Sequence, residues 1–309
     1  MHHPFPLAAR VAAAWLLVAA AERPLPADPG RARILETRLL RAHADEDSEE
    51  LTRVARHLGP ARIAALLADR NRALRTAALS AAPHLRTSFL LLAPLVELMQ
   101  GQDRPLAAAA ARAVRRITED LRVSELERYD EMPSTLRPLF ARVLAVAVDR
   151  AHALDVRTEA ILALAQTAEL LDLEEAARFR LLADPDPRVR TVAVELLATR
   201  RTKSALGRLA RLAALDPSPA VARAALVTLC GQLPEEGGVA KEPALEALQH
   251  ARAQVRLRRA AEDAAATDDE LLDLGQCLRR LATPADRQAY ARLRARSPHL
   301  QQALPPPSR

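Results

Sequence analysis

Aromatic residues are scarce in this chain of 309 residues, at 2% of the composition, although half of the chain is hydrophobic. A buried core must therefore consist mainly of Ala, Leu and Val. Because Ala and Leu favour helices over strands, and because only 8 glycines are present, the composition predicts an all-α protein. The alternating pattern of strands and the Gly-rich turns of nucleotide-binding folds are both absent.

The motifs of common enzymes are missing as well. The sequence contains no G-x-G-x-x-G, Walker A, G-x-S-x-G or H-E-x-x-H pattern. Its eight histidines are scattered, and the nearest approach to a ligand pair, His152 with Asp155, is better explained as a solvated helix end. The sequence therefore predicts a protein that is not an enzyme, with no catalytic residues, no metal site and no cofactor.

Lysine is nearly absent, since only Lys203 and Lys241 contribute to the 45 basic residues. The net charge of +6 is compatible with a nucleic-acid or anionic-membrane partner. However, a GC-rich bacterial genome produces an excess of Arg and Ala without selection for phosphate binding. The positive charge is also interspersed with 39 acidic residues. Charge alone therefore makes nucleic acid an unfavoured partner.

Only two cysteines are present, Cys230 and Cys277. A single disulfide is compatible with this count, but nothing in the sequence requires one. The sequence favours the interpretation that both cysteines are small, buried, apolar residues on neighbouring helices.

The N-terminal segment has few charges and a short apolar run from Val11 to Ala21, which ends in three alanines. This pattern is typical of a cleaved secretory signal peptide at residues 1–21, followed by a Pro-rich linker at 22–30. The run is too short to span a bilayer. The pattern predicts export to the periplasm or the extracellular space; the alternative is a cytoplasmic protein whose first helix is structural.

One pattern recurs along the middle of the chain. An apolar anchor residue is followed by apolar residues at positions +3, +4, +7 and +8, which form one stripe of a helix. Successive anchors are about 32 to 34 residues apart, except for one gap with room for an insertion at about 118–134, near Tyr129. A period in this range is typical of an array of helical hairpins. The six anchors are Leu74, Leu106, Val156, Val189, Val221 and Val255.

Each predicted hairpin has a stop signal between its helices. The first helix ends at an Asp, which is often followed by Pro, as in Asp184-Pro185-Asp186-Pro187. Proline ends the first helix because it lacks an N–H group, and it is tolerated in the first turn of the second helix. One such hairpin cannot bury its apolar face alone, so several must stack.

The segment 181–194, Leu-Leu-Ala-Asp-Pro-Asp-Pro-Arg-Val-Arg-Thr-Val-Ala-Val, resembles the HEAT-repeat family, in particular its phycobilisome-lyase-like type. The resemblance implies an α-solenoid of about six HEAT-like hairpins with capping helices at both ends. It also implies a structural ladder in which the Asp that closes a first helix pairs with the Arg after an anchor. The matching residues are Asp69, Arg75, Asp184, Arg190 and Asp216.

The predicted organisation has caps on either side of the repeats. Capping helices occupy 31–58, the repeats span 59–262, and further capping helices occupy 263–296. Thr267 and Glu270 form a predicted capping box at the start of a helix. Residues 297–309 are predicted to be a disordered tail.

A stacked array of this kind presents a concave surface lined by its second helices, and such surfaces bind proteins or peptides. A non-enzymatic scaffold is therefore the predicted function, although the partner's identity cannot be read from the residues. The candidate contact positions are Arg112, Leu162, Glu195, Arg223 and Val227.

Two alternatives stay open. One is nucleic-acid or anionic-surface binding through an Arg-rich ridge, for which a second cluster at Arg252, Arg256, Arg258 and Arg259 adds support. The other is a lyase-like accessory protein, in view of the family resemblance. The candidate basic patch is Arg200, Arg201, Lys203, Arg208 and Arg211.

Overall fold

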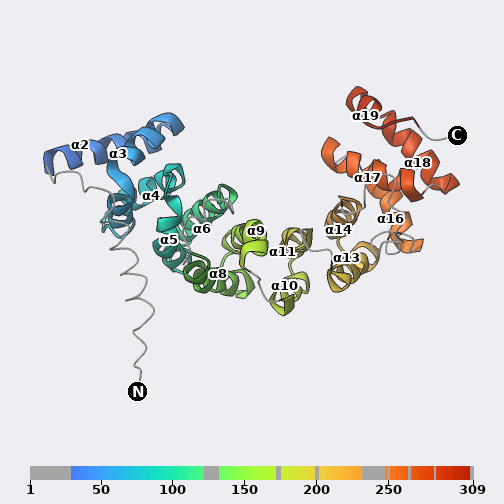
Figure 1. Cartoon of the computed structure of the whole chain (residues 1–309), viewed down its shortest axis with the longest axis horizontal. Coiled ribbons are helices and arrows are strands. Elements are labelled where there is room, and N and C mark those ends of the chain that lie inside the picture. The colour runs from blue at the N-terminus through green and yellow to red at the C-terminus, as the bar shows by residue number, and fades with distance from the viewer. Residues whose placement is uncertain are drawn as a thin grey trace, which may run out of the picture. The chain divides into compact units, whose positions relative to one another are not determined.

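The computed structural model of the chain is all-α (Figure 1). It describes residues 29–121, 132–171, 175–198, 202–231, 248, 251–263, 266–281 and 283–306, and these contain no strand. The predicted signal peptide, nearly all of the predicted linker and most of the insertion around Tyr129 lie outside these residues. None of the described helices is long and apolar enough to cross a membrane.

The chain divides into two compact units, an N-terminal unit of residues 1–172 and a C-terminal unit of residues 173–309. The helices of the N-terminal unit are α2 (Pro29–Ala44), α3 (Ser48–Leu67), α4 (Arg72–Ala81), the short 3-10 helices η1 (Ala82–His84) and η2 (Ser88–Leu91), α5 (Leu92–Met99), α6 (Arg104–Glu119), α8 (Met132–Val148) and α9 (Leu154–Leu171). Those of the C-terminal unit are α10 (Glu175–Leu182), α11 (Pro187–Ala193), α12 (Glu195–Ala198), α13 (Lys203–Leu215), α14 (Pro219–Gly231), α16 (Ala251–Glu262), α17 (Asp268–Leu281), α18 (Pro284–Arg294) and α19 (Pro298–Ala303).

Helical hairpins stack in the N-terminal unit as the repeat pattern predicts. Helix α3 packs on α4, α5 on α6 and α8 on α9, while the second helices α4, α6 and α9 also pack on one another in sequence (Figure 1). In α6 the buried stripe includes Leu106, Ala110, Val114 and Ile117. The small alanines in this stripe let neighbouring helices approach closely, which compensates for the shortage of aromatic side chains.

Helix α3 spans the predicted boundary between the N-terminal cap and the first repeat. Its N-terminal end is capped by the Asp47 carboxylate, which accepts hydrogen bonds from the backbone N–H groups of Glu49 and Glu50. The helix then bends at Gly59, where φ is +71°, a value that glycine tolerates best, and Pro60 follows. The residues on either side of this bend pack as two helices although the chain between them is continuous.

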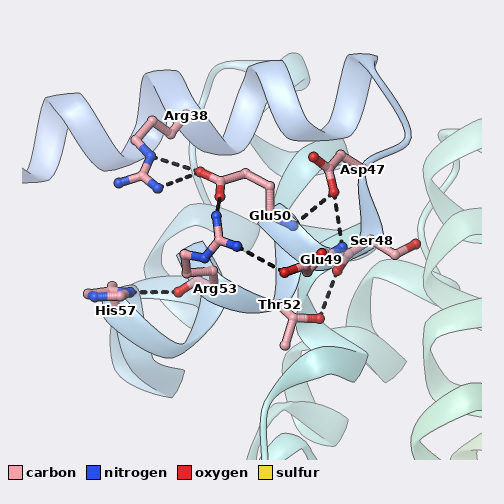
Figure 2. Close-up of polar contacts among 8 residues, drawn as sticks. All are labelled: Arg38, Asp47, Ser48, Glu49, Glu50, Thr52, Arg53 and His57. Carbon is pink, nitrogen blue, oxygen red and sulfur yellow. Dashed lines mark hydrogen bonds and ion pairs between the residues drawn. The ribbon is translucent and has the colours of Figure 1, made fainter.

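Polar contacts hold α2 against the first half of α3 (Figure 2). The Arg38 guanidinium on α2 donates to Glu50 on α3, with its Nε 2.8 Å from the carboxylate oxygen. Arg53, one turn further along α3, pairs with both Glu49 and Glu50. These arginines are about half exposed, so the pairs orient the helices and contribute little net stability.

The C-terminal unit repeats the hairpin arrangement, with α10 packed on α11 and α13 on α14. Helix α14 contacts α11 on one side and α17 on the other, whereas α16 packs on α13. Helix α16 therefore takes the place of a first helix, and α17 is the second helix that follows it. The prediction that Val255 anchors a second helix is wrong, because this side chain is 42% exposed, and α16 buries Ala253, Leu257 and Ala261 instead.

A disulfide joins Cys230, near the end of α14, to Cys277 on α17, with their Cα atoms 5.5 Å apart. The sequence interpretation of two unbonded buried thiols was wrong. Both residues are buried, as that interpretation expected, but the stacking of α17 directly on α14 brings the two sulfur atoms together. Spacing along the chain cannot reveal this contact.

The predicted disordered tail is also wrong for most of its length. Residues Pro298–Ala303 form α19, whose N-terminus is capped by Ser297. Leu304 is buried against Gly275 of α17, where a Cβ atom would lie only 2.9 Å from the Leu304 side chain. The Tyr290 hydroxyl donates to the carbonyl of Pro305 over 2.6 Å. The absence of a side chain at Gly275 thus leaves room for Leu304, and this contact holds the C-terminal segment against α17.

Candidate partner-binding groove

The Asp that closes a first helix forms the same turn in four repeats. One carboxylate oxygen of each Asp accepts a hydrogen bond from the backbone N–H two residues later, over 2.7 Å at Asp69, 2.9 Å at Asp149, 2.9 Å at Asp184 and 2.8 Å at Asp216. This local bond fixes the change of direction between the two helices. It also explains why a short carboxylate suits this position, although the repeat that has Gly101 there lacks one.

Arginines cap the ends of the first helices. The Arg75 guanidinium donates to the carbonyl of Asp69 at the end of α3, and Arg190 donates to the carbonyl of Asp184 after α10. Arg157 does the same for Ala147 at the end of α8. A cation suits this place because the last carbonyls of a helix lack partners and carry partial negative charge.

Arg190 also reaches the neighbouring repeat. Its Nε and Nη2 atoms lie 2.9 Å from the two carboxylate oxygens of Asp216, forming a bidentate pair. The hydrogen bond from Arg190 to Asp216 raises the pKa of this arginine, so it stays charged although it is largely buried. Among the described residues Arg75 has no equivalent carboxylate partner, because Gly101 stands at the matching position of the next repeat.

A second buried pair joins α16 to α18. The Arg258 guanidinium lies 2.7 Å from the carboxylate of Asp286, which is fully buried. The other Asp286 oxygen accepts a hydrogen bond from the Thr283 hydroxyl. Arg258 follows the buried Leu257 as Arg190 follows the buried Val189, although α16 stands in the place of a first helix and α11 is a second helix.

The C-terminal unit contains a groove with a volume of about 390 Å³ between α14 and α16. The buried side chains of Ala222, Leu226 and Ala260 form its floor. The turn between α13 and α14 adds the exposed rings of Pro217 and Pro219, and charged side chains form the rim. We call this the α14–α16 groove. Its rim residues are Arg223, Arg256, Arg259, Glu262 and Asp263.

Several rim charges are already engaged. Arg223 lies 2.6 Å from the Asp263 carboxylate and 3.6 Å from that of Glu270 on α17. Arg256 donates to the carbonyl of Asp216 over 2.8 Å, at the end of α13. Glu262 pairs with Arg292 of α18 over 2.6 Å. Arg259 is exposed and has no ion-pair partner among the described residues.

The structure distributes the predicted contact positions over both units. Arg112 on α6 is exposed and Leu162 on α9 is half exposed, both in the N-terminal unit. Glu195 is exposed at the start of α12, and Val227 is half exposed on α14. Arg223 is the one of these five that lines the groove. Repeat spacing therefore identified one rim residue, but nothing in the pattern indicated the floor.

The predicted basic patch is described only in part. Arg200 and Arg201 lie outside the described residues, and of Lys203 only its place at the start of α13 is described. Arg211 is exposed, whereas the guanidinium of Arg208 lies over the Phe179 ring, 4.8 Å from its centroid. This contact is a cation–π interaction that fixes Arg208 against α10.

No group of three His, Cys, Asp or Glu side chains that could hold a metal ion occurs among the described residues. The predicted pair His152 and Asp155 lies around the start of α9, where the His152 ring is 3.9 Å from Asp149. The Asp155 carboxylate accepts a hydrogen bond from the N–H of Val156.

Comparison with known proteins supports the fold. No protein-family model matches the chain, and no curated protein sequence matches it. Its structure is similar to the X-ray structure of YIBA_ECOLI, with a TM-score of 0.53 and 14% sequence identity, over 91% of this chain and 97% of that chain. With the elements described above, this likeness shows an armadillo/HEAT-type α-solenoid fold, which by itself does not define a function.

Two designed armadillo repeat proteins are also similar to the chain. YIII(Dq)4CqI has a TM-score of 0.48 at 17% identity, over 71% of this chain and 98% of that chain. YIII(Dq.V1)4CPAF, whose structure is a complex with the peptide (KR)4, has a TM-score of 0.44 at 16% identity, over 69% of this chain and 96% of that chain.

Proposed function

We propose that this chain is a non-enzymatic repeat scaffold that binds an extended segment of a protein or peptide in the α14–α16 groove. The observation that carries this proposal is the combination of an apolar floor, made of Ala222, Leu226 and Ala260, with a rim of charged groups. Binding sites for flexible ligands share this composition, since the floor supplies burial and a few polar groups fix orientation.

The HEAT-type resemblance of residues 181–194 supports the same conclusion. Stacked helical hairpins present extended surfaces, and these suit an elongated occupant better than a compact one. A short exposed turn such as Pro217 to Pro219 adds rigid, pre-ordered contacts, which lower the entropy lost on binding.

We propose further that the protein acts outside the cytoplasm. The disulfide between Cys230 and Cys277 supports this, because such bonds persist in oxidising compartments and are rare in the cytosol. The apolar run ending at Ala21 supports it independently. Intact-mass measurement of the protein from the envelope fraction of its host tests the localisation: a chain starting at Glu22 is expected, and a full-length cytosolic chain would refute it.

Site-specific labelling tests the groove. Both cysteines of the chain are bonded, so an Arg259→Cys variant has one free thiol for a fluorophore. Peptides selected from a random display library against the unlabelled protein are expected to change the fluorescence of this label. They should also bind the labelled protein more weakly than the unlabelled one.

The matched control is Arg287→Cys on α18, an exposed position outside the groove. Its label should not respond to the same peptides. Equal responses at both positions, or a selection that yields no peptide, would overturn the proposed groove.

A further inference from the structure

The charges on the rim of the α14–α16 groove do not balance. Asp263 is paired with Arg223, and Glu262 is paired with Arg292, which lies outside the groove. Both carboxylates of the rim therefore have cationic partners, and Arg223 has carboxylate partners in turn.

Two rim cations have no carboxylate partner among the described residues, Arg256 and Arg259. The bonds of Arg256 go from its Nη1 atom to the backbone carbonyls of Ala213 and Asp216, over 3.4 and 2.8 Å. These bonds fix the side chain in place without neutralising its charge. Because Arg256 and Arg259 are three residues apart on α16, they lie on the same face of the helix, and both line the groove.

We propose that the occupant of the α14–α16 groove is an acidic peptide segment, in which a carboxylate pairs with Arg259 and Arg256 while neighbouring apolar side chains cover Leu226 and Ala222. This inference rests on the proposed function and specifies the chemistry of the partner. Guanidinium groups bind carboxylates through two parallel hydrogen bonds, and Arg256 keeps its Nε and Nη2 donors for this, because its Nη1 atom makes the bonds to the backbone carbonyls.

The composition of the groove favours a peptide over a nucleic acid. A phosphate backbone binds to a series of cations, yet only Arg256 and Arg259 on this rim have no carboxylate partner among the described residues, and Glu262 and Asp263 stand beside them. Among the described residues, no aromatic side chain lines the groove for bases to stack on. An acidic peptide can pair one carboxylate with Arg256 and Arg259 and place its uncharged residues beside Glu262 and Asp263.

Three short synthetic peptides with the same Leu, Pro and Ser residues test the proposal, differing only in whether their variable positions hold Asp, Gln or Lys. Their dissociation constants are measured by fluorescence anisotropy at several salt concentrations, with an oligonucleotide as a fourth probe. The Asp peptide is expected to bind most tightly, and added salt should weaken its binding.

A charge-reversal variant tests whether Arg259 binds the carboxylate of the peptide. Arg259→Glu should weaken binding of the Asp peptide by about 10- to 100-fold, as expected for the loss of a charge-assisted bond and its replacement by repulsion. The Lys peptide should gain affinity in this variant. Arg287→Glu, which makes the same charge change on α18, should leave all four affinities unchanged, and unaltered circular dichroism of both variants confirms folding.

The other outcomes separate the two proposals. If the Gln or Lys peptide binds more tightly than the Asp peptide and still changes the fluorescence of the label at position 259, the acidic partner is refuted and the scaffold stands. If the oligonucleotide binds most tightly and loses affinity in Arg259→Glu, the partner is a nucleic acid and the peptide proposal fails. If none of the four probes binds, both proposals are overturned.

Discussion

The two units of the molecule share one architecture but connect their helices differently. In the N-terminal unit, the pairs Arg38–Glu50 and Arg72–Asp103 join neighbouring helices through exposed arginines, and the pair Arg115–Glu159 between α6 and α9 is only partly buried. In the C-terminal unit, Arg190 and Asp216 form a pair that is largely buried, with side chains 11% and 5% exposed. A disulfide joins α14 to α17 in the same unit.

This difference determines how each unit responds to mutation. An exposed ion pair is screened by water and salt, so the loss of one partner costs little. A buried pair contributes little net stability when intact, because both charges had to leave water. Its disruption is expensive, however, because the remaining charge stays buried without a counter-ion. The loss of one partner of the buried Arg190–Asp216 pair should therefore cost more stability than the loss of one partner of an exposed pair such as Arg38–Glu50.

The largest effect is expected from Asp216→Asn. The amide can still accept the hydrogen bond from the Ser218 N–H, but Arg190 loses the carboxylate to which it donates two hydrogen bonds. The free energy of unfolding of the C-terminal unit should fall by about 3–5 kcal/mol, as measured by urea denaturation and hydrogen exchange.

The control for this variant is Glu36→Gln, which removes the partner of the exposed Arg62 in the N-terminal unit. This change should cost about 0–1 kcal/mol. Replacing Arg190 by Met in the Asp216→Asn background should restore part of the lost stability. Equal costs for Asp216→Asn and Glu36→Gln would show that burial does not distinguish the units.

A somewhat smaller effect is expected from removing the disulfide. The bond closes a segment of 47 residues, and its loss increases the entropy of the unfolded chain, which should cost about 2–4 kcal/mol. The double variant Cys230→Ala and Cys277→Ala should show faster hydrogen exchange in α14 and α17. Exchange in α4 and α6 serves as the internal reference, and equal acceleration there would contradict a role confined to the C-terminal unit.

The smallest effect is expected in the pH dependence of the stability of the N-terminal unit. Burial, followed in size by the nearby Arg116, lowers the pKa of His84 below its usual 6.5, although Asp120 partly opposes the shift. The unfolded chain therefore binds a proton more readily than the folded chain. The stability that this histidine contributes is present above pH 6.5 and is lost as the pH falls below that value.

His84→Asn removes the titrating group and keeps a polar side chain that can hydrogen-bond to the Thr52 hydroxyl, which lies 2.9 Å from the His84 ring. Thermal unfolding at about pH 7.5 and pH 5.5 should show a smaller pH-dependent loss in this variant than in the parent chain. An identical loss in both proteins would exclude His84 as a cause of the pH dependence.

Local signals in the sequence predicted much of the fold. The turn at Asp184 and Pro185 and the period of the anchors indicated stacked helical hairpins. The capping box is confirmed, because Thr267 and Glu270 exchange hydrogen bonds of 2.9 and 3.2 Å. These features depend on residues only a few positions apart, so they can be predicted from the local sequence.

Features that depend on packing between distant segments could not be predicted in this way. Helix α16 has only two large apolar residues, Val255 and Leu257, among its Ala and Arg residues, and this weak pattern allowed Val255 to be taken as an anchor although Leu257 is the buried position. The disulfide forms only when α17 packs on α14. The contact between Gly275 and Leu304 forms only when the C-terminal segment packs on α17. The groove floor has the same cause, because Leu226 and Ala260 come from different helices.

The bend at Gly59 has a practical consequence for dividing the protein into parts. A fragment cut at this glycine would leave only residues 60–67 of α3 to pair with α4, and a helix of about two turns is not stable by itself. The cap and the first hairpin therefore have to be expressed together, from α2 onward. A residue with a side chain at position 59 would have to adopt φ +71° and ψ 168°, a conformation that is nearly restricted to glycine, at a cost of about 1–3 kcal/mol. The bend at Gly59 thus limits both where the chain can be cut and which residue can replace the glycine.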